Sequence, residues 1–365
     1  MANLIESRIE QWTADGLIDP AVRDRLLAWE RAHAEPQRWP VRVALAFGAI
    51  LLAAGVLLFV SAHWDRLSPA SRMTLVVALV AVFHAGGAAS AGRFEGLSVA
   101  LHTLGTVALG AAIALAGQIF NLSDHWPSAI LLWSLGALAA WALLGHWTQA
   151  ALAAILLPYW LAGEWWTVAH PHNLSMLPVA VGVCSLSLVY LSARRGADDS
   201  LLRKALAWIG GIALLPSALA LGAIPYSAAG GNWPPRAIAW AVAILAPLAI
   251  AIVLRGRDAV WSGAAIVWTQ LLAVANGHHL AVYVWCAAGS AGLAFWGTRE
   301  SRPERINLGI LGFALTVAVF YFSDVMDKLG RSAGLMAVGL LLLGGGWLLE
   351  RARRRLLTHA RQEAL

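Results

Sequence analysis

The sequence predicts an all-α protein: a polytopic transmembrane helical bundle of about 12 spans (range 10–12), with a small N-terminal helical hairpin. The mean hydropathy is +0.68. Charged residues make up 13% of the chain, whereas a soluble domain has about 25%. From Val41 onward, apolar runs recur with lengths near the roughly twenty residues that cross a bilayer. These observations exclude an ordinary soluble domain.

The net charge of +6 indicates how the chain is threaded rather than what it binds. Lys and Arg lie between the apolar runs and are not gathered on one face, which argues against a nucleic-acid partner. The 19 tryptophans suit a chain with many aromatic rings at the bilayer surface. The partner that composition predicts is therefore the lipid bilayer, and no nucleic acid.

The first 39 residues predict a cytoplasmic cap of two short amphipathic helices. Apolar residues at helical spacing predict one helix over residues 3–13, followed by a turn over 15–18. Asp19 followed by Pro20 predicts the start of a second helix that runs to about Ala34. Helices this short are marginal alone. The cap is expected to pack on itself, on the membrane surface or on a cytoplasmic protein partner, and a solvated cap without a recruiting role is an equal alternative.

Residues 40–350 form the predicted membrane domain, and residues 351–365 form a short basic tail. No signal peptide is expected, because residues 1–40 are polar. The two least secure boundaries are those between the fourth and fifth runs and between the ninth and tenth. The runs cover residues 41–62, 73–91, 97–119, 128–145, 148–166, 174–193, 204–224, 235–254, 258–275, 279–297, 305–322 and 333–349.

The basic residues predict that both termini are cytoplasmic. With the N-terminus placed in the cytoplasm, 21 of the 26 Lys and Arg fall in cytoplasmic segments, as the positive-inside rule requires for short loops. An odd number of spans would put the arginines of the tail on the other side, so an even number is favoured. A weak internal parallel repeat of spans 1–2 and 3–4 is also plausible, as is chance reuse of interfacial residues.

The third run carries a stripe of small and polar residues. Thr106, Gly110, Gly117 and Asn121 fall within roughly 80° of a helical wheel. Such a stripe on a membrane helix faces other helices or water, because lipid offers polar groups no partner. The predicted polar pathway comprises His102, Thr106, Gly110, Gly117, Gln118, Asn121 and Glu164.

Glu164 is the most conspicuous polar residue of the predicted spans. It lies near the outer end of the fifth run, beyond Pro158, which can break the helix and free carbonyl groups. Such a carboxylate suits a proton- or cation-coupled carrier. It equally suits a solvated, ionised group at headgroup depth among tryptophans. His84 and His102 are expected to be neutral and hydrogen-bonded between helices.

The predicted outer loops hold six of the eleven histidines and four aspartates. If a metal or proton-relay site exists there, its members are His63, Asp65, Asp124 and His125. No spacing is diagnostic of a metal, and the favoured explanation is interfacial His and Trp that anchor helix ends, with Asp at turns. We therefore assign no catalytic residue, no cofactor and no metal.

Other motifs exclude whole classes of chemistry or leave alternatives open. Cys184 and Cys286 both lie in apolar runs, so no disulfide framework is indicated. No phosphate-binding loop and no Gly-x-Ser-x-Gly elbow occurs. The prolines at 158, 178, 216 and 247 either line a binding cavity in broken helices or are simple kinks.

Three groups of residues carry a resemblance to a known family. They are the cap residues Trp12, 16–19 and 29–30, the segments 62–65 and 67–69, and the segments 117–122 and 125–126. Over about residues 4–165 the chain resembles the bacterial predicted-membrane-protein family called "domain of unknown function 2157". The resemblance implies a bacterial multi-pass protein of the inner membrane. It implies no activity, cofactor or catalytic residue.

Three functions are compatible with the sequence. The leading hypothesis is a permease-like carrier of a small solute or lipid. The second is a non-transporting scaffold or sensor whose cap recruits a cytoplasmic partner. The third is an intramembrane enzyme that uses the outer His and Asp residues.

Overall fold

The computed structural model describes residues 15–33, 67–121, 125–196, 199–224, 234–275 and 279–322, with a few isolated positions outside these ranges. The chain divides into two compact units, residues 1–72 and 73–365. The first and twelfth predicted spans, most of the first cap helix and the basic tail lie outside the described residues. The predicted boundary of the cap at residue 39 also lies outside them and stays a prediction.

In the first unit, helix α2 spans Pro20–His33, as the sequence predicts. The turn before it contains Gly16 at φ 70°, a left-handed conformation that glycine adopts without strain. The carbonyl of Asp19 accepts hydrogen bonds from the backbone N–H groups of Val22 and Arg23 and so opens the helix. The apolar side chains of Val22 and Leu26, one turn apart, are exposed.

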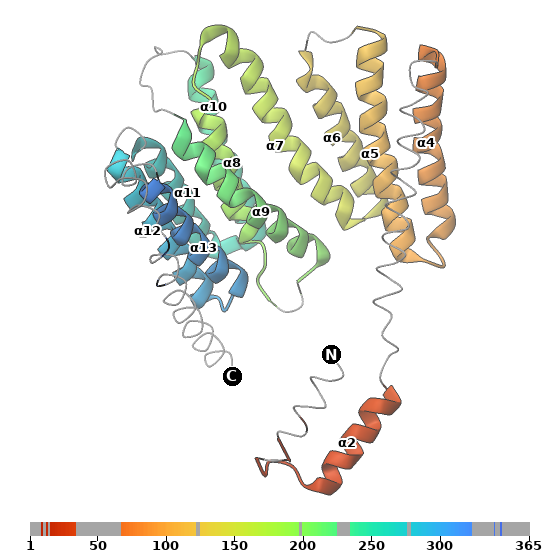
Figure 1. Ribbon diagram of the computed structural model, residues 1–365. Coiled ribbons are helices and arrows are strands. Elements are labelled where there is room, and N and C mark those ends of the chain that lie inside the picture. The colour runs from red at the N-terminus through yellow and green to blue at the C-terminus, as the bar shows by residue number, and fades with distance from the viewer. Residues whose placement is uncertain are drawn as a thin grey trace. The chain divides into compact units, whose positions relative to one another are not determined.

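Each of the ten apolar runs from the second to the eleventh forms one helix (Figure 1). Their boundaries lie within a few residues of the predicted ones. The helices are α4 (Pro69–Ser90), α5 (Glu95–Ile119), α6 (Pro127–Leu144), α7 (Trp147–Ala169), α8 (Leu177–Leu191), α9 (Leu201–Ala223), α10 (Pro234–Arg255), α11 (Ala259–Ala275), α12 (His279–Arg299) and α13 (Pro303–Phe320).

The least secure predicted boundary, between the fourth and fifth runs, has a clear physical cause. Gly145 ends α6 in a left-handed conformation, φ 69°, and its N–H donates to the carbonyl of Trp141. His146 is extended and starts α7. A residue with a side chain would be strained at Gly145, so the helix ends there.

Seven helical stretches among the described residues are long and apolar enough to cross a membrane. One of them, Pro234–Ala275, contains both α10 and α11, separated by the short 3-10 turn Gly256–Asp258. Helix α8 is apolar but shorter, and the 23-residue α7 is not among the seven. The seven are α4, α5, α6, α9, the α10–α11 stretch, α12 from Leu280, and α13.

Helix α8 is the centre of the second unit. It contacts α9, α10 and α11, and most of its residues are buried. Its apolar side chains Val181, Cys184 and Val189 are fully buried, as expected for a helix that is apolar on all sides. The hydroxyls of Ser185 and Thr269 are hydrogen-bonded at 2.6 Å and tie α8 to α11.

Candidate functional site

A cavity of about 460 Å³ lies between α7, α8 and α10. Its walls are mostly apolar side chains, and Glu164 places a carboxylate among them. Pro158, Pro178 and Pro247 also line it. Three of the four central prolines therefore line this cavity. The helices themselves continue through Pro158 and Pro247, so they are not broken there.

Pro158 creates a polar position on the cavity side of α7. A proline has no N–H, so the carbonyl four residues earlier loses its partner within the helix. That carbonyl belongs to Ala154, and the hydroxyl of Tyr190 on α8 donates to it at 3.0 Å. A side chain from a neighbouring helix thus satisfies the freed carbonyl, as an apolar environment requires. The same hydrogen bond joins two walls of the cavity.

The third wall approaches α8 closely at Gly182. A Cβ atom at Gly182 would lie 3.4 Å from the Cα and Cβ atoms of Ala243 on α10. Two small residues at a helix contact let the backbones come near each other. The cavity therefore has one wall fixed by a hydrogen bond and another fixed by small residues.

The carboxylate of Glu164 is held by two side chains. The ring of His125 donates through Nε2, which lies 3.1 and 3.0 Å from Oε1 and Oε2 of Glu164. Trp160, one turn earlier on α7, donates its indole N–H to Oε1 at 2.8 Å. The Glu164 side chain is 33% exposed and that of His125 is 49% exposed. Two residues predicted for different sites thus form one polar pair.

Gly163 explains why His125 reaches Glu164. A Cβ atom at Gly163 would lie 2.6 Å from the indole of Trp126, so only glycine leaves room for this ring. Trp126 also lies near Tyr159, with ring centroids 6.0 Å apart. The ring fixes the segment before α6 against α7, and it places the neighbouring His125 beside the neighbouring Glu164.

The stripe on α5 divides into two parts. Thr106 is 1% exposed and its hydroxyl donates to the carbonyl of His102. Trp133 of α6 donates to the carbonyl of Thr106 at 2.8 Å, and its ring occupies the space beside Gly110. This half of the stripe faces a helix and is filled by an indole.

The other half of the stripe is more open. Among the described residues, no atom outside the backbone of α5 lies within 4 Å of the Cβ position of Gly117. Gln118 is exposed, and Asn121, at φ 51°, is also exposed beyond the end of α5. A role for these residues in a polar pathway with Glu164 stays a prediction.

His84 and His102 form a hydrogen bond between α4 and α5, as predicted from the sequence. Their Nδ1 atoms are 2.9 Å apart, so one ring donates to the other. The packing is reciprocal. A Cβ at Gly105 of α5 would lie 2.7 Å from the ring of His84, and a Cβ at Gly87 of α4 would lie 2.7 Å from the ring of His102. Each glycine thus makes room for the histidine of the other helix.

Of the four residues predicted for an outer metal or proton-relay site, only His125 is described. His63, Asp65 and Asp124 lie outside the described residues. Within the described part of the chain, no group of three or more His, Cys, Asp or Glu is placed to hold a metal ion. The partner that the structure gives His125 is Glu164, a residue of α7.

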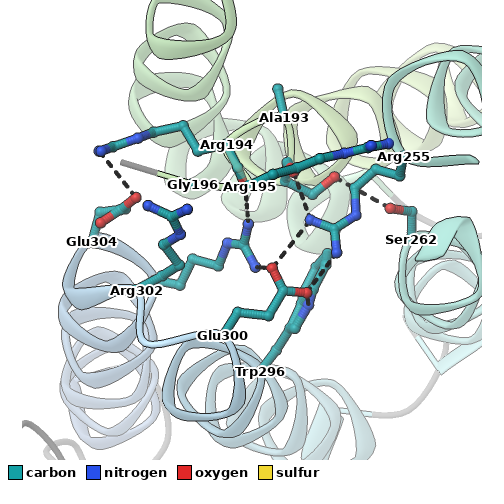
Figure 2. A network of polar contacts seen from close by, with 12 residues as sticks. Ala193, Arg194, Arg195, Gly196, Arg255, Ser262, Trp296, Glu300, Arg302 and Glu304 are labelled. Atoms are coloured by element: carbon teal, nitrogen blue, oxygen red, sulfur yellow. Dashed lines mark hydrogen bonds and ion pairs between the residues drawn. The ribbon is translucent and has the colours of Figure 1, made fainter. Parts of the chain in front are cut away.

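Sequence reasoning missed a second polar cluster, which we call the arginine cluster. It joins the loop after α8, the end of α10 and the loop between α12 and α13 (Figure 2). These three loops lie at one end of their helices, as the predicted alternation of the spans requires. The sequence signal was present in the acidic residues that accompany the arginines in these loops. The cluster comprises Arg194, Arg195, Asp199, Arg203, Arg255, Glu300, Arg302, Glu304 and Arg305.

Glu300 is at the centre of the arginine cluster. Its carboxylate accepts hydrogen bonds from Arg255 at 2.6 and 3.1 Å and from Arg305 at 2.7 Å. Trp296 donates its indole N–H to the same group. Burial alone would raise the pKa of Glu300, but the hydrogen bonds from Arg255 and the charge of Arg305 outweigh it. The pKa is therefore lowered from its ordinary value.

The helices and their hydropathy define the class of the protein: it is a helical membrane protein with several apolar helices that contact the lipid bilayer. Residues 10–151 match the family model described as "Predicted membrane protein (DUF2157)". The match confirms the resemblance inferred from the sequence. No curated protein and no solved structure matches the chain.

Proposed function

We propose that the protein is a carrier that moves a lipid, or another elongated amphipathic molecule, through the bilayer. The observation that supports this proposal is the cavity between α7, α8 and α10. Its volume of about 460 Å³ falls within the range of about 300–1,000 Å³ of ligand sites in proteins. The apolar part of the substrate occupies the cavity, and its polar part lies beside Glu164.

The character of the walls favours a lipid over a small polar solute. Burying a polar group without a hydrogen-bond partner costs about 1–3 kcal/mol in proteins, and most of the cavity offers no such partner. The half of the α5 stripe at Thr106 and Gly110 is filled by Trp133 and offers no route for a solute either. An acyl chain needs only apolar contacts, which the cavity supplies.

The polar part of the substrate has a defined position in this proposal. Glu164 lines the cavity while its carboxylate binds His125 and Trp160. A carboxylate and an imidazole together offer hydrogen-bond acceptors and donors to a headgroup. Glu164 therefore orients the molecule, with its polar end at this rim of the cavity.

The proposal includes location and sidedness. The distribution of Lys and Arg supports cytoplasmic termini, and the family resemblance supports a location in a bacterial inner membrane. In that orientation the arginine cluster is cytoplasmic and Glu164 lies near the opposite face. Attaching a protease-sensitive tag after Leu365 and treating intact cells with protease tests this. Cleavage from outside would contradict the proposed sidedness.

Lipid flipping in reconstituted vesicles tests the carrier proposal. The full-length protein is placed in vesicles that contain a fluorescent phospholipid, and a membrane-impermeant reductant reports how fast the lipid moves from the inner to the outer leaflet. Ala246→Trp fills the cavity, because Ala246 lines it. Ala249→Trp is the matched control, because Ala249 is exposed on the same helix.

The two variants separate a carrier from a protein that merely perturbs the bilayer. We expect flipping by the wild type and by Ala249→Trp, and at least a tenfold loss in Ala246→Trp. No flipping by the wild type, or equal flipping by Ala246→Trp, would contradict the proposal.

The exposed apolar face of α2 supports a second candidate, a cap that recruits a cytoplasmic protein. Leu17, Val22 and Leu26 are exposed on or beside this helix. Such a face commonly docks on a partner. Val22→Glu with Leu26→Glu is then expected to abolish capture of that partner without affecting membrane insertion. Flipping that persists in this variant would separate the two functions.

A further inference from the structure

We propose that the arginine cluster binds a phosphate group through Arg194 and Arg302. The cluster has six guanidinium groups and three carboxylates, so positive charge is in excess. It lies where helices α8, α10 and α12 end. The site is separate from the cavity, and the inference does not depend on a carrier function.

Four of the six arginines have structural partners. Arg255 and Arg305 bind Glu300 from two sides. Arg195 and Arg203 both donate to the carbonyl of Leu254, near the C-terminus of α10. Cations at the C-terminal ends of helices are favourable because they meet unpaired carbonyls. These four arginines hold the three loops together.

Arg302 and Arg194 are different, because neither guanidinium donates a hydrogen bond to a described residue. The Nε atoms of Arg255 and Arg305 also lack a partner among the described residues, but their Nη atoms donate to Glu300. Arg302 is 9% exposed. Its Nη2 lies 3.8 Å from Oδ2 of Asp199, too far for a hydrogen bond, and its Nε is buried without a hydrogen-bond partner among the described residues. Arg194 lies 3.9 Å from the same oxygen through Nε, which is also buried and unpaired within the described part of the chain.

The nearby carboxylates do not supply the hydrogen bonds that these two guanidinium groups lack. Oδ2 of Asp199 already accepts the backbone N–H groups of Arg195 and Gly196 at 2.8 and 3.1 Å. Glu304 forms an ion pair with Nη1 of Arg194 at 3.2 Å, and within the described part of the chain the other donors of that guanidinium have no hydrogen-bond partner. Figure 2 shows the side chain of Arg302 extending toward Arg194. The two guanidinium groups thus lie near each other with free donors.

A phosphate group matches this arrangement. A guanidinium group presents planar donors that bind phosphate oxygens in pairs, and such charge-assisted hydrogen bonds are strong. A buried guanidinium without hydrogen bonds is costly, so an anion that bound both groups would stabilise the fold. Basic pockets at the ends of membrane helices hold the headgroups of anionic lipids. Free phosphate has the same chemistry and is the other source.

The test measures binding to the purified, delipidated full-length protein in a neutral detergent. The probes are phosphatidylglycerol, a diacylglycerol with the same chains but no phosphate, and inorganic phosphate. Native mass spectrometry counts bound lipid, and thermal unfolding reports stabilisation. Arg194→Gln with Arg302→Gln removes the site, and Arg302→Lys keeps its charge without the planar fork. Arg257→Gln is the matched control, because Arg257 is exposed on the neighbouring 3-10 turn.

We expect phosphatidylglycerol, but not the diacylglycerol, to bind and to raise the unfolding temperature. The double variant should bind phosphatidylglycerol at least about tenfold more weakly than the wild type. A tenfold loss of affinity corresponds to about 1.4 kcal/mol of binding free energy. Arg302→Lys should bind with intermediate affinity, and Arg257→Gln should behave as wild type. Stabilisation by inorganic phosphate alone would support the site and identify the free anion as its ligand.

Two outcomes would overturn the proposal. One is a wild-type protein that neither phosphatidylglycerol nor phosphate stabilises. The other is undiminished binding by the double variant. If the double variant does not fold, the overturning result is instead that Arg302→Lys binds as tightly as the wild type. Flipping activity is not part of either readout, so failure here leaves the carrier proposal untouched.

Discussion

The hydroxyl of Tyr190 donates a hydrogen bond to the carbonyl of Ala154, the residue four positions before Pro158. A helix–helix hydrogen bond thus replaces the one that proline removes. The contact joins α7 to α8 beside the cavity. Its contribution to stability depends on the proline, because an ordinary residue at 158 would supply its own N–H to Ala154.

Tyr190→Phe is expected to destabilise the protein by about 1 kcal/mol, because the Ala154 carbonyl loses its partner in an apolar environment. The measurement is the unfolding temperature in detergent, followed by tryptophan fluorescence. In the Pro158→Ala background, where the helix supplies the missing hydrogen bond, the same change should cost much less. A double-mutant cycle measures this difference, and equal costs in both backgrounds would contradict the interpretation.

Gly105→Ala is expected to destabilise the contact between α4 and α5 by about 1–3 kcal/mol, the usual cost of overpacking. The new Cβ would lie 2.7 Å from the ring of His84 and force the ring away from His102. The reciprocal change Gly87→Ala should have a similar effect. Gly96→Ala is the control, because no atom of a neighbouring described residue outside its own helix backbone lies within 4 Å of its Cβ position. If all three variants unfold at the same temperature, the reciprocal packing contributes nothing.

Glu300→Gln is expected to destabilise the arginine cluster strongly. Removing one member of a buried ion pair typically costs about 3–5 kcal/mol; here we expect the lower end, because the Glu300 side chain is 21% exposed. The change leaves Arg255 and Arg305, which are 4% and 0% exposed, without their shared anion. Unfolding in detergent measures the cost, and Glu95→Gln at the start of α5, exposed and far along the chain, is the control.

The pH dependence of stability has a defined sign at Glu300. Its pKa is lower in the folded protein than its ordinary value, so the folded state binds fewer protons. The stability that this group contributes is complete above its unfolded pKa, about 4.3, and is lost as pH falls through the lower folded value. Between about pH 5 and pH 3 the unfolding temperature of the wild type should therefore fall more steeply than that of Glu300→Gln.

Glu164→Gln separates a role in binding from a role in folding. The His125–Glu164 pair is partly exposed, and such pairs contribute about 0–1 kcal/mol. We expect a small change in unfolding temperature together with a severalfold loss of lipid flipping. A large loss of stability with normal flipping would show instead that the pair is structural.

The helices could be predicted closely because each depends on local properties. The length of each apolar run predicts a membrane span. The break at Gly145 and His146 was visible as a short interruption between two apolar runs. Hydrogen bonding of His84 and His102 between helices could also be predicted, since polar groups inside membrane helices need partners, but that they bond to each other could not.

The site depends on which helices are neighbours, and one sequence does not specify this. His125 and Glu164 were both recognised as unusual, but they are 39 positions apart and were placed in different candidate sites. Trp133 illustrates the same difficulty, because the space beside Gly110 is filled by a ring from another helix. The arginines were interpreted as topology signals, and their hydrogen bonds depend on three loops meeting at one end.

Helices α8 and α10 pack closely at Gly182 and Ala243. Among the described residues they are also joined by a side-chain hydrogen bond at one end, where Arg255 donates to the carbonyl of Ser192 at 2.9 Å. The same two helices form two walls of the cavity, which extends from Pro178 and Pro235 to Tyr190. That hydrogen bond lies at the Tyr190 end of the cavity. If the protein carries a lipid as proposed, the molecule is therefore expected to enter at the opposite end and to meet Glu164 before Tyr190.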